Sequence, residues 1–325
     1  MVDLHCLARD VVHDVLKTVM GASRLLRVLR WIEALKYFDQ RVLDIEWGNE
    51  QIYRAVSADI RQAIGKLGSV ELQALRAYLR CLRAGSEERF RRLTAPYRRT
   101  LYINAGVYPD DPKTYSRYCQ YMLTEILPEI SVVGVWFNWG EARIVKRFAR
   151  AAVRVHARGL ETYYCESHRW TELLDGKDVV VLTPFAQSVR RQYERRERLW
   201  PGRESVLPEF RLQVIEVPQQ ASLVPPRVAN WFGALEDLKR RMSDAVFDVA
   251  LIGAGAFSLP LAVHAKRLGR CGIHLGGDLQ AYFGIRSRRI DKHPVVSKFV
   301  NEHWVRPLAQ ETPGGKDIIE NGCYW

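Results

Sequence analysis

The feature that most constrains the fold is an apolar run that ends in a pair of glycines, within residues 248–278. A run with the length and composition of a parallel strand buried on both faces leads directly into Gly253 and Gly255. Ser258 is a good N-cap for the helical stretch that follows, and a second strand-like run begins at Cys271. The spacing therefore predicts a strand, a glycine turn, a helix and a second strand.

Two glycines at a strand-to-helix turn let the backbone approach a phosphate, whose charge the free N–H groups and the helix dipole stabilise. The fingerprint of dinucleotide-binding proteins is incomplete, because Ser258 occupies its third glycine position. The second strand also ends at His274, where a ribose-binding acid would be expected. A nucleotide is the favoured ligand, and a glycine turn needed only for close packing is the structural alternative.

Polar or glycine residues follow two strand-like runs in the places where α/β proteins form ligand crevices. Gly276 and Gly277 come after the second strand, and Asp278 follows them. Asp278 can meet a sugar hydroxyl, a metal or an acceptor, or it can cap a helix. Thr183 ends another buried-type strand and can line the same crevice, or it can serve only in a structural turn.

A second glycine-bearing segment lies near residue 65. Gly65 and Gly68 flank Lys66, strand character precedes them, and a helical run follows. This places Ser69 and Glu71 at a helix N-terminus. Lys66 can pair with a phosphate, while Glu71 can bind a divalent ion or act as a base. The alternative is an ordinary helix start, capped by Gly68 or Ser69 and carrying a first-turn glutamate.

From about residue 60, apolar runs of strand length alternate with helical stretches. The alternation predicts an α/β fold that is Rossmann-like, with a largely parallel sheet flanked by helices. We expect an N-terminal helical segment over residues 1–58 and an α/β domain that binds the nucleotide over 59–325. The predicted strands lie near 62–67, 101–104, 131–137, 159–164, 178–183, 211–217, 248–253 and 271–275. The predicted helices cover 70–82, 113–128, 139–152, 185–199, 227–243 and 258–268.

Apolar residues recur at intervals of three and four from Val15 to Leu35, among arginines at 24, 27 and 30. This pattern fits a basic amphipathic helix resting on an anionic membrane, and it also fits a helix packed on its own domain. Charged residues interrupt every apolar run near the N-terminus, so we expect no signal peptide. No stretch is long and apolar enough to span a bilayer.

The charge balance favours anionic partners. Lys and Arg number 49 against 37 Asp and Glu, which gives a formal net charge of +12. No recognition module for nucleic acid accompanies this charge, so nucleic acid is not the expected partner. The six cysteines include no CxxC pair, which is typical of reduced thiols in a cytosolic protein.

Two segments carry a resemblance to a known family. The run from Lys66 to Glu71 resembles the R-x-G-D-G-E segment of the GT-D glycosyltransferases, and residues 251–278 are similar to that group's later strand, glycine loop, helix and strand. The chain also resembles uncharacterised proteins encoded with bacterial capsule and O-antigen genes, at 183–185, 274–277 and 322–325. The resemblance implies transfer of a sugar from a nucleotide-sugar donor to a glycan or lipid-linked acceptor. It also implies a cytoplasmic location, peripheral to the inner membrane.

The resemblance assigns catalytic roles to Glu71 and Asp278, and it makes Glu71 a ligand of Mg²⁺ or Mn²⁺. Ser69 stands where the family has an aspartate, and a hydroxyl is a poorer metal ligand than a carboxylate, so metal dependence stays open. The alternatives are a Rossmann-type oxidoreductase or methyltransferase acting on sugars, and a non-catalytic nucleotide-binding module. The residues expected to contact the donor are Gly65, Lys66, Gly68, Ser69, Thr183, Gly253, Gly255, Ser258, His274, Gly276 and Gly277.

Overall fold

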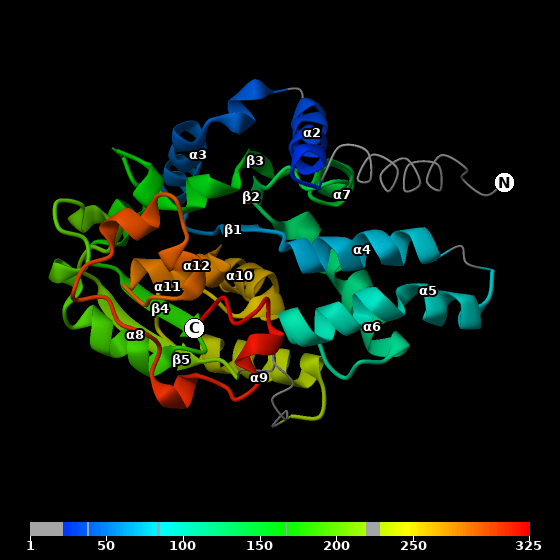
Figure 1. Cartoon of the computed structure of the whole chain (residues 1–325). Helices are drawn as coiled ribbons and strands as arrows, with labels where there is room; N and C mark the ends of the chain where they lie inside the picture. The colour runs from blue at the N-terminus through cyan, green and yellow to red at the C-terminus, as the bar shows by residue number, and fades with distance from the viewer. Residues whose placement is uncertain (1–21, 38, 83–84, 167, 219–227) are drawn as a thin grey trace.

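The computed structural model describes residues 22–37, 39–82, 85–166, 168–218 and 228–325. It confirms the predicted α/β class, because helices flank one sheet whose described strands all pair in parallel (Figure 1). The strand order is β3-β2-β1-β7-β6-β4-β5. The strands are β1 (Ala63–Lys66), β2 (Val132–Val135), β3 (Val153–His156), β4 (Asp178–Thr183), β5 (Arg211–Glu216), β6 (Val249–Ile252) and β7 (Cys271–His274).

Helices cover both faces of this sheet. The first face packs against α4 (Ser69–Cys81), α6 (Pro112–Tyr121), α7 (Glu141–Phe148), α9 (Trp231–Ser243) and α10 (Ser258–Arg267). The second face packs against α3 (Ile45–Ala58), α8 (Ala186–Tyr193), α11 (Leu279–Tyr282) and α12 (Arg288–Asp291). The remaining helices are α2 (Ala22–Leu35), which contacts α7, and α5 (Glu87–Thr100), which contacts α4.

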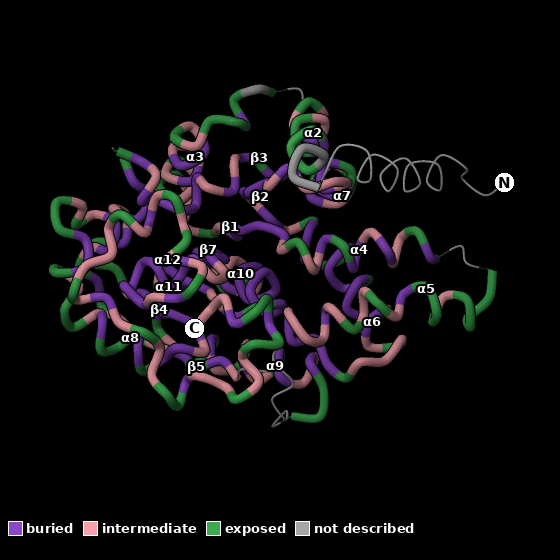
Figure 2. The backbone as a smooth tube through the Cα atoms, in the orientation of Figure 1, coloured by how far each residue is buried: buried purple, intermediate pink, exposed green. Residues whose placement is uncertain are grey.

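The central strands β4 and β6 are mostly apolar along their length because both faces of the sheet are covered. In β4, Val180 and Leu182 join the hydrophobic cluster of the first face, whereas Val179 and Val181 join that of the second. Figure 2 shows the resulting buried layer through the middle of the molecule. The continuous apolar runs in the sequence therefore correspond to strands with a helix layer on each side.

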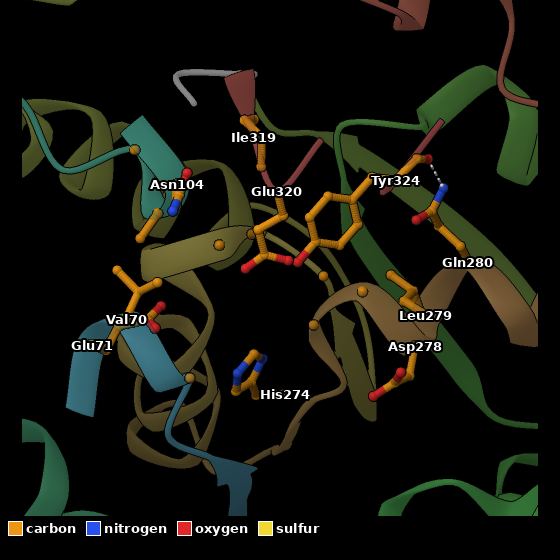
Figure 3. Close-up of a pocket in the computed structure, with 18 of the residues that line it drawn as sticks. Val70, Glu71, Asn104, His274, Asp278, Leu279, Gln280, Ile319, Glu320 and Tyr324 are labelled. Atoms are coloured by element: carbon orange, nitrogen blue, oxygen red, sulfur yellow. Dashed lines mark hydrogen bonds between the residues drawn. The ribbon is translucent and has the colours of Figure 1, made fainter. Parts of the chain in front are cut away.

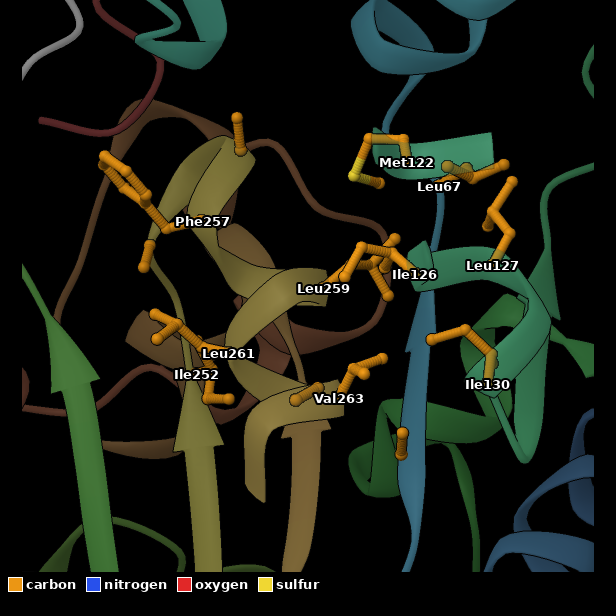
Figure 4. Packing of buried hydrophobic residues seen from close by; sticks show 14 of the residues in the cluster. Leu67, Met122, Ile126, Leu127, Ile130, Ile252, Phe257, Leu259, Leu261 and Val263 are labelled. Atoms are coloured by element: carbon orange, nitrogen blue, oxygen red, sulfur yellow. The ribbon is translucent and has the colours of Figure 1, made fainter. Parts of the chain in front are cut away.

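Helix α10 lies unusually close to the sheet. Leu261 of α10 packs in the same cluster as Ile126 and Ile130 of the segment that precedes β2 (Figure 4). On its inner side, a Cβ placed on Gly272 would lie 2.5 Å from the Cα of Ala262. The glycine in β7 is therefore a packing requirement, since any larger residue would push α10 away from the sheet.

Two predicted strands are wrong. The run 101–104 is helical, because Leu101–Ala105 continues α5 as a wide helical turn with Leu101 buried. The run 159–164 forms two short 3-10 turns, and the strand of this region lies earlier, at Val153–His156, where helix 139–152 was predicted to end. Periodicity alone does not separate short apolar runs of helix from strand, and the edge strand has only four residues, in which Arg154 and His156 alternate with valines.

The described part of the N-terminal segment is helical, as predicted. Ile52 of α3 is fully buried in the same cluster as residues of the sheet. The predicted helical residues before Ala22, including Val15, lie outside the described residues. Within the described ranges, no helix has both the length and the apolarity that crossing a bilayer would require.

Candidate functional site

A cavity of about 430 Å³ lies at the edge of the sheet where the strands end (Figure 3). Residues at or directly after the carboxyl ends of six strands line it. They are Gly68 after β1, Trp136 after β2, Thr183 at the end of β4, Val217 after β5, Gly253 after β6 and His274 at the end of β7.

At this edge of the sheet, the segments that follow two neighbouring strands turn to opposite faces. β1 leads into α4 on the first face, whereas its partner β7 leads into α11 on the second face. Such a divergence opens a crevice beyond the strand ends, which is where open α/β sheets bind their ligands. The cavity therefore has the position expected for a ligand site in this fold.

The predicted site residues converge on this cavity, with the exception of Gly65 and Ser258. The segments after β1, β4, β6 and β7 face one space although they lie far apart in the sequence. The predicted residues that line it are Lys66, Gly68, Ser69, Glu71, Thr183, Gly253, Gly255, His274, Gly276, Gly277 and Asp278.

Gly65 and Ser258 lie behind the cavity wall. A Cβ on Gly65 would be 2.7 Å from Leu259 Cδ2 and 2.8 Å from His274 Cβ, so this glycine makes room for its neighbours. Ser258 is fully buried, and its hydroxyl accepts a hydrogen bond from the Ala254 N–H at 2.9 Å. It is not an N-cap, because α10 begins at Ser258 itself. Ser258 therefore stabilises the glycine turn, Gly65 allows the close approach of Leu259 and His274, and neither residue lines the cavity.

The two glycine loops depend on backbone conformations that favour glycine. Gly255 has φ of 54° and Gly276 has φ of 63°, both in the left-handed region. The loops also touch, since a Cβ on Gly253 would lie 2.8 Å from the carbonyl oxygen of Gly276. Close packing thus explains part of the glycine pattern, and the same backbone still forms one wall of the cavity.

Asp278 is held by two cations. Its carboxylate pairs with the ammonium of Lys66 and lies 2.8 Å from Arg289 Nη2, and the residue is only 5% exposed. Burial alone would raise the pKa of Asp278, but the charges of Arg289 and Lys66 outweigh it and lower that pKa. Asp278 is therefore an ionised, fully engaged carboxylate, and the Lys66 ammonium is engaged with it.

A second buried carboxyl, Glu161, joins this group from outside the cavity. Its Oε1 lies 3.8 Å from Lys66 Nζ, and its Oε2 accepts a hydrogen bond from the Tyr163 hydroxyl at 3.0 Å. Burial, and then the charge of Asp278, raise the pKa of Glu161 to about 7. The pKa values of two neighbouring carboxyls are thus pushed apart, a pattern common at functional sites. The sequence feature that could have indicated Glu161 is an acidic residue inside an apolar run.

Two polar atoms in the cavity wall have no hydrogen-bond partner among the described residues. They are Nδ1 of His274 and Oε1 of Gln280. His274 is 9% exposed, and its ring points into the cavity (Figure 3). Burial, and then the charge of Lys66, lower the pKa of His274 to about 3, so the imidazole is neutral near pH 7. Buried polar atoms without partners are uncommon, and a ligand with polar groups would satisfy both.

Glu71 lies at the start of α4, where its carboxylate folds back over Gly68. Burial raises the pKa of Glu71, its own amide opposes this shift, and the charge of Glu320 adds to it. Among the described residues, no group of three or more His, Cys, Asp or Glu side chains is arranged to hold a metal ion. The residues therefore do not fit a metal site built by the protein alone, with Glu71 as its ligand.

One helix N-terminus near the cavity is already occupied. The carboxylate of Glu311 accepts hydrogen bonds from the amides of Gln187 and Ser188 at 2.7 and 3.1 Å, at the start of α8. This N-terminus follows the Thr183 loop, where an anionic ligand would otherwise be expected. The chain's own carboxylate takes that position and links the C-terminal segment to α8.

The sequence did not indicate the contribution of the last elements of the chain. Arg289 of α12, Gln280 of α11 and a C-terminal loop all line the cavity. Arg289 and the C-terminal loop do not follow predicted strands. Gln280 comes shortly after the predicted strand 271–275, but pattern alone gave no reason to select it. The loop contributes Ile319, Glu320, Tyr324 and Trp325.

Fold and site together define a Rossmann-like α/β protein with a cavity of mixed polar and apolar lining at the carboxyl edge of its parallel sheet. Comparisons of the chain with protein-family models, curated proteins and solved structures give no match. The geometry of this cavity is therefore the basis for a proposed function.

Proposed function

We propose that the chain is a glycosyltransferase that transfers a sugar from a nucleotide-sugar donor to a polysaccharide or lipid-linked acceptor, in the assembly of bacterial surface glycans. The observation that carries the proposal is the meeting of two glycine-bearing segments, after β1 and after β6, in one cavity. These are the segments on which the resemblance to GT-D glycosyltransferases rests. The two segments lie far apart along the chain, so their meeting in one cavity does not follow from their positions in the sequence.

The cavity supports a polar small-molecule ligand of this kind. Its volume of about 430 Å³ lies within the ~300–1,000 Å³ range of small-molecule sites. The unpartnered atoms of His274 and Gln280 suit the hydroxyl and amide groups of a sugar or a base. The glycine turn before α10 presents backbone to the same space, which suits the diphosphate.

Within this proposal, Asp278 is a positioning residue. A carboxylate bound by Lys66 and Arg289, with a lowered pKa, is a poor proton acceptor. It instead holds both cations at the floor of the cavity, where they can offset the charge that develops on a departing diphosphate. No step is assigned to a metal ion, since the part of the chain that the structure describes brings together no group of three or more metal-ligating side chains.

We place the enzyme in the cytoplasm against the inner membrane, with α2 as the contact. Val28, Trp31 and Leu35 form an apolar stripe on the outer side of α2, and Trp31 is 64% exposed. Arg27 is exposed beside the stripe, and Arg30 on the same helix lines the cavity. An apolar stripe with flanking arginines on a protein of net charge +12 matches the surface of an anionic bilayer. The cavity would then open near a lipid-linked acceptor.

A ligand panel tests the proposed function. We expect one of a set of UDP-, GDP- and dTDP-sugars to raise the Tm of the chain, because a ligand of the native state stabilises it. The same donor should be hydrolysed slowly to the nucleoside diphosphate, which chromatography would measure. NAD(P)H and S-adenosylmethionine serve as comparison ligands. If one of them raised Tm while no nucleotide sugar bound or was hydrolysed, the proposal would be wrong.

A further inference from the structure

The C-terminal segment closes one side of the cavity and is anchored at several points. The Arg289 N–H donates to the carbonyl of Cys323 at 3.0 Å, and Gln280 Nε2 donates to the carbonyl of Tyr324 at 3.0 Å. The Tyr324 ring packs against Gly277, where any side chain would collide with it. The segment is therefore a fixed wall of the cavity.

The backbone of this segment is strained at Glu320. Glu320 and Asn321 have φ of 44° and 58°, so two successive residues with side chains adopt the left-handed conformation. Each such residue costs about 1 kcal/mol or more and persists only where the surroundings fix it. Here Ile319 is buried on one side, and Arg288 Nη1 donates to the Asn321 carbonyl at 2.8 Å on the other. Strain held in this way is typical of functional sites.

The strained turn directs the Glu320 carboxylate into the cavity. Figure 3 shows this carboxylate and the His274 ring pointing into the same space from opposite sides. Within the described ranges, Glu320 forms no ion pair with a cation. Its Oε2 accepts a hydrogen bond from the Cys323 thiol at 3.3 Å. If the Glu320 carboxylate only filled the position of a ligand phosphate, it would be paired with cationic side chains of the protein. Glu320 thus differs from Asp278, whose oxygens are engaged, and from Glu71, which folds over its own helix.

We propose that Glu320 is the general base that takes the proton from the acceptor hydroxyl. This inference rests on the proposed glycosyl transfer. The acceptor oxygen attacks the anomeric carbon, its proton passes to Glu320, and a new glycosidic C–O bond forms. The bond from the anomeric carbon to the diphosphate oxygen breaks, and its electron pair leaves with the nucleoside diphosphate. A direct displacement of this kind inverts the anomeric configuration.

The test compares an acceptor that must lose a proton with one that has none to lose. With the donor that raises Tm in the panel, water serves as the first acceptor and azide as the second. In Glu320→Gln we expect donor hydrolysis to fall by about 10²- to 10⁴-fold, the usual contribution of a general base. Transfer to azide should stay within a few-fold of wild type, and so should the donor Kd from calorimetry. Glu302→Gln, an exposed change outside the cavity, should alter neither reaction.

The possible outcomes separate the two proposals. Equal hydrolysis by Glu320→Gln and wild type would overturn the role of Glu320 and leave the glycosyltransferase proposal standing. An equal fall in hydrolysis and azide transfer would also overturn it, since that is the signature of a damaged cavity. If wild type neither binds nor hydrolyses any nucleotide sugar, the proposed function fails and this inference fails with it.

Discussion

At the scale of single residues, the most informative feature is the buried charged group at the floor of the cavity. Lys66, Asp278 and Glu161 lie within ion-pair range, and Arg289 completes the group. Removing one partner from a buried pair leaves an uncompensated charge, which usually costs more than the pair contributes. Glu161 can avoid that cost by binding a proton, so this group should make stability depend on pH.

The first prediction concerns that dependence. The pKa of Glu161 is raised from 4.5 to about 7, mainly by burial and then by Asp278. The protonated form therefore stabilises the fold fully below the unfolded pKa, and this contribution is lost as the pH rises through about 7. Glu161→Gln mimics the protonated form at every pH. Relative to this variant, the unfolding free energy of wild type should fall by about 3 kcal/mol between about pH 5 and about pH 8.

Urea denaturation at both pH values measures this difference. Glu197→Gln, at a side chain that is 82% exposed, is the matched control and should track wild type throughout. A constant difference between wild type and Glu161→Gln would show that the carboxyl does not titrate in this range.

At the scale of elements, Glu311 links the C-terminal segment to α8. Its carboxylate takes the place of an N-cap residue for a helix that has no side-chain cap of its own. The Trp325 indole N–H also donates to the Glu311 carbonyl at 3.1 Å. One residue thus fixes both a helix end and the wall that carries Glu320.

The second prediction follows from this link. Glu311→Ala should leave the amides of Gln187 and Ser188 without their acceptor and should cost about 1–2 kcal/mol, as for other lost caps. Hydrogen exchange should show faster exchange at both amides and in residues 312–325. Glu302→Ala, at a glutamate that is 82% exposed and forms no hydrogen bond or ion pair with α8 in the part of the chain that the structure describes, serves as the control. Unchanged exchange at the two amides would mean that another group caps α8.

The elements also show what the sequence could and could not predict. The central strands β4, β6 and β7 were predictable because burial on both faces requires unbroken apolar runs. The edge strand β3 was missed because it is only four residues long and Arg154 and His156 interrupt its apolar character, and 101–104 was misassigned because helix α5 continues through it. The spacing of the glycines in the sequence indicated most of the segments that form the cavity wall. Glu161, Arg289 and Glu320 escaped prediction because only tertiary contacts bring them to the site.

At the scale of the whole molecule, α2 connects the cavity with the outer surface. Arg30 lines the cavity, while Trp31, the next residue, is exposed on the apolar stripe. Binding of this stripe to a bilayer would set the orientation of the cavity relative to the membrane. Arginines near the membrane surface would add about 1 kcal/mol each on anionic lipid.

The third prediction is that Trp31→Glu weakens binding to vesicles containing phosphatidylglycerol at least tenfold, because it puts a negative charge on the apolar stripe. Cosedimentation at low and high salt measures the binding. Val246→Glu makes the same change at a residue that is 70% exposed before β6, at the amino edge of the sheet, and should bind like wild type. Equal binding by Trp31→Glu and wild type would exclude α2 as the contact.

The pairing of β1 with β7 has a consequence for how the protein is made. The Lys66–Asp278 contact at the floor of the cavity joins residues 212 positions apart. Such a contact forms late, because a long loop must close before it gives any stabilisation. We expect a ribosome-bound chain that has emerged only as far as β6 to have no donor affinity at all. The substrate would then bind and stabilise only chains in which β7 has paired with β1.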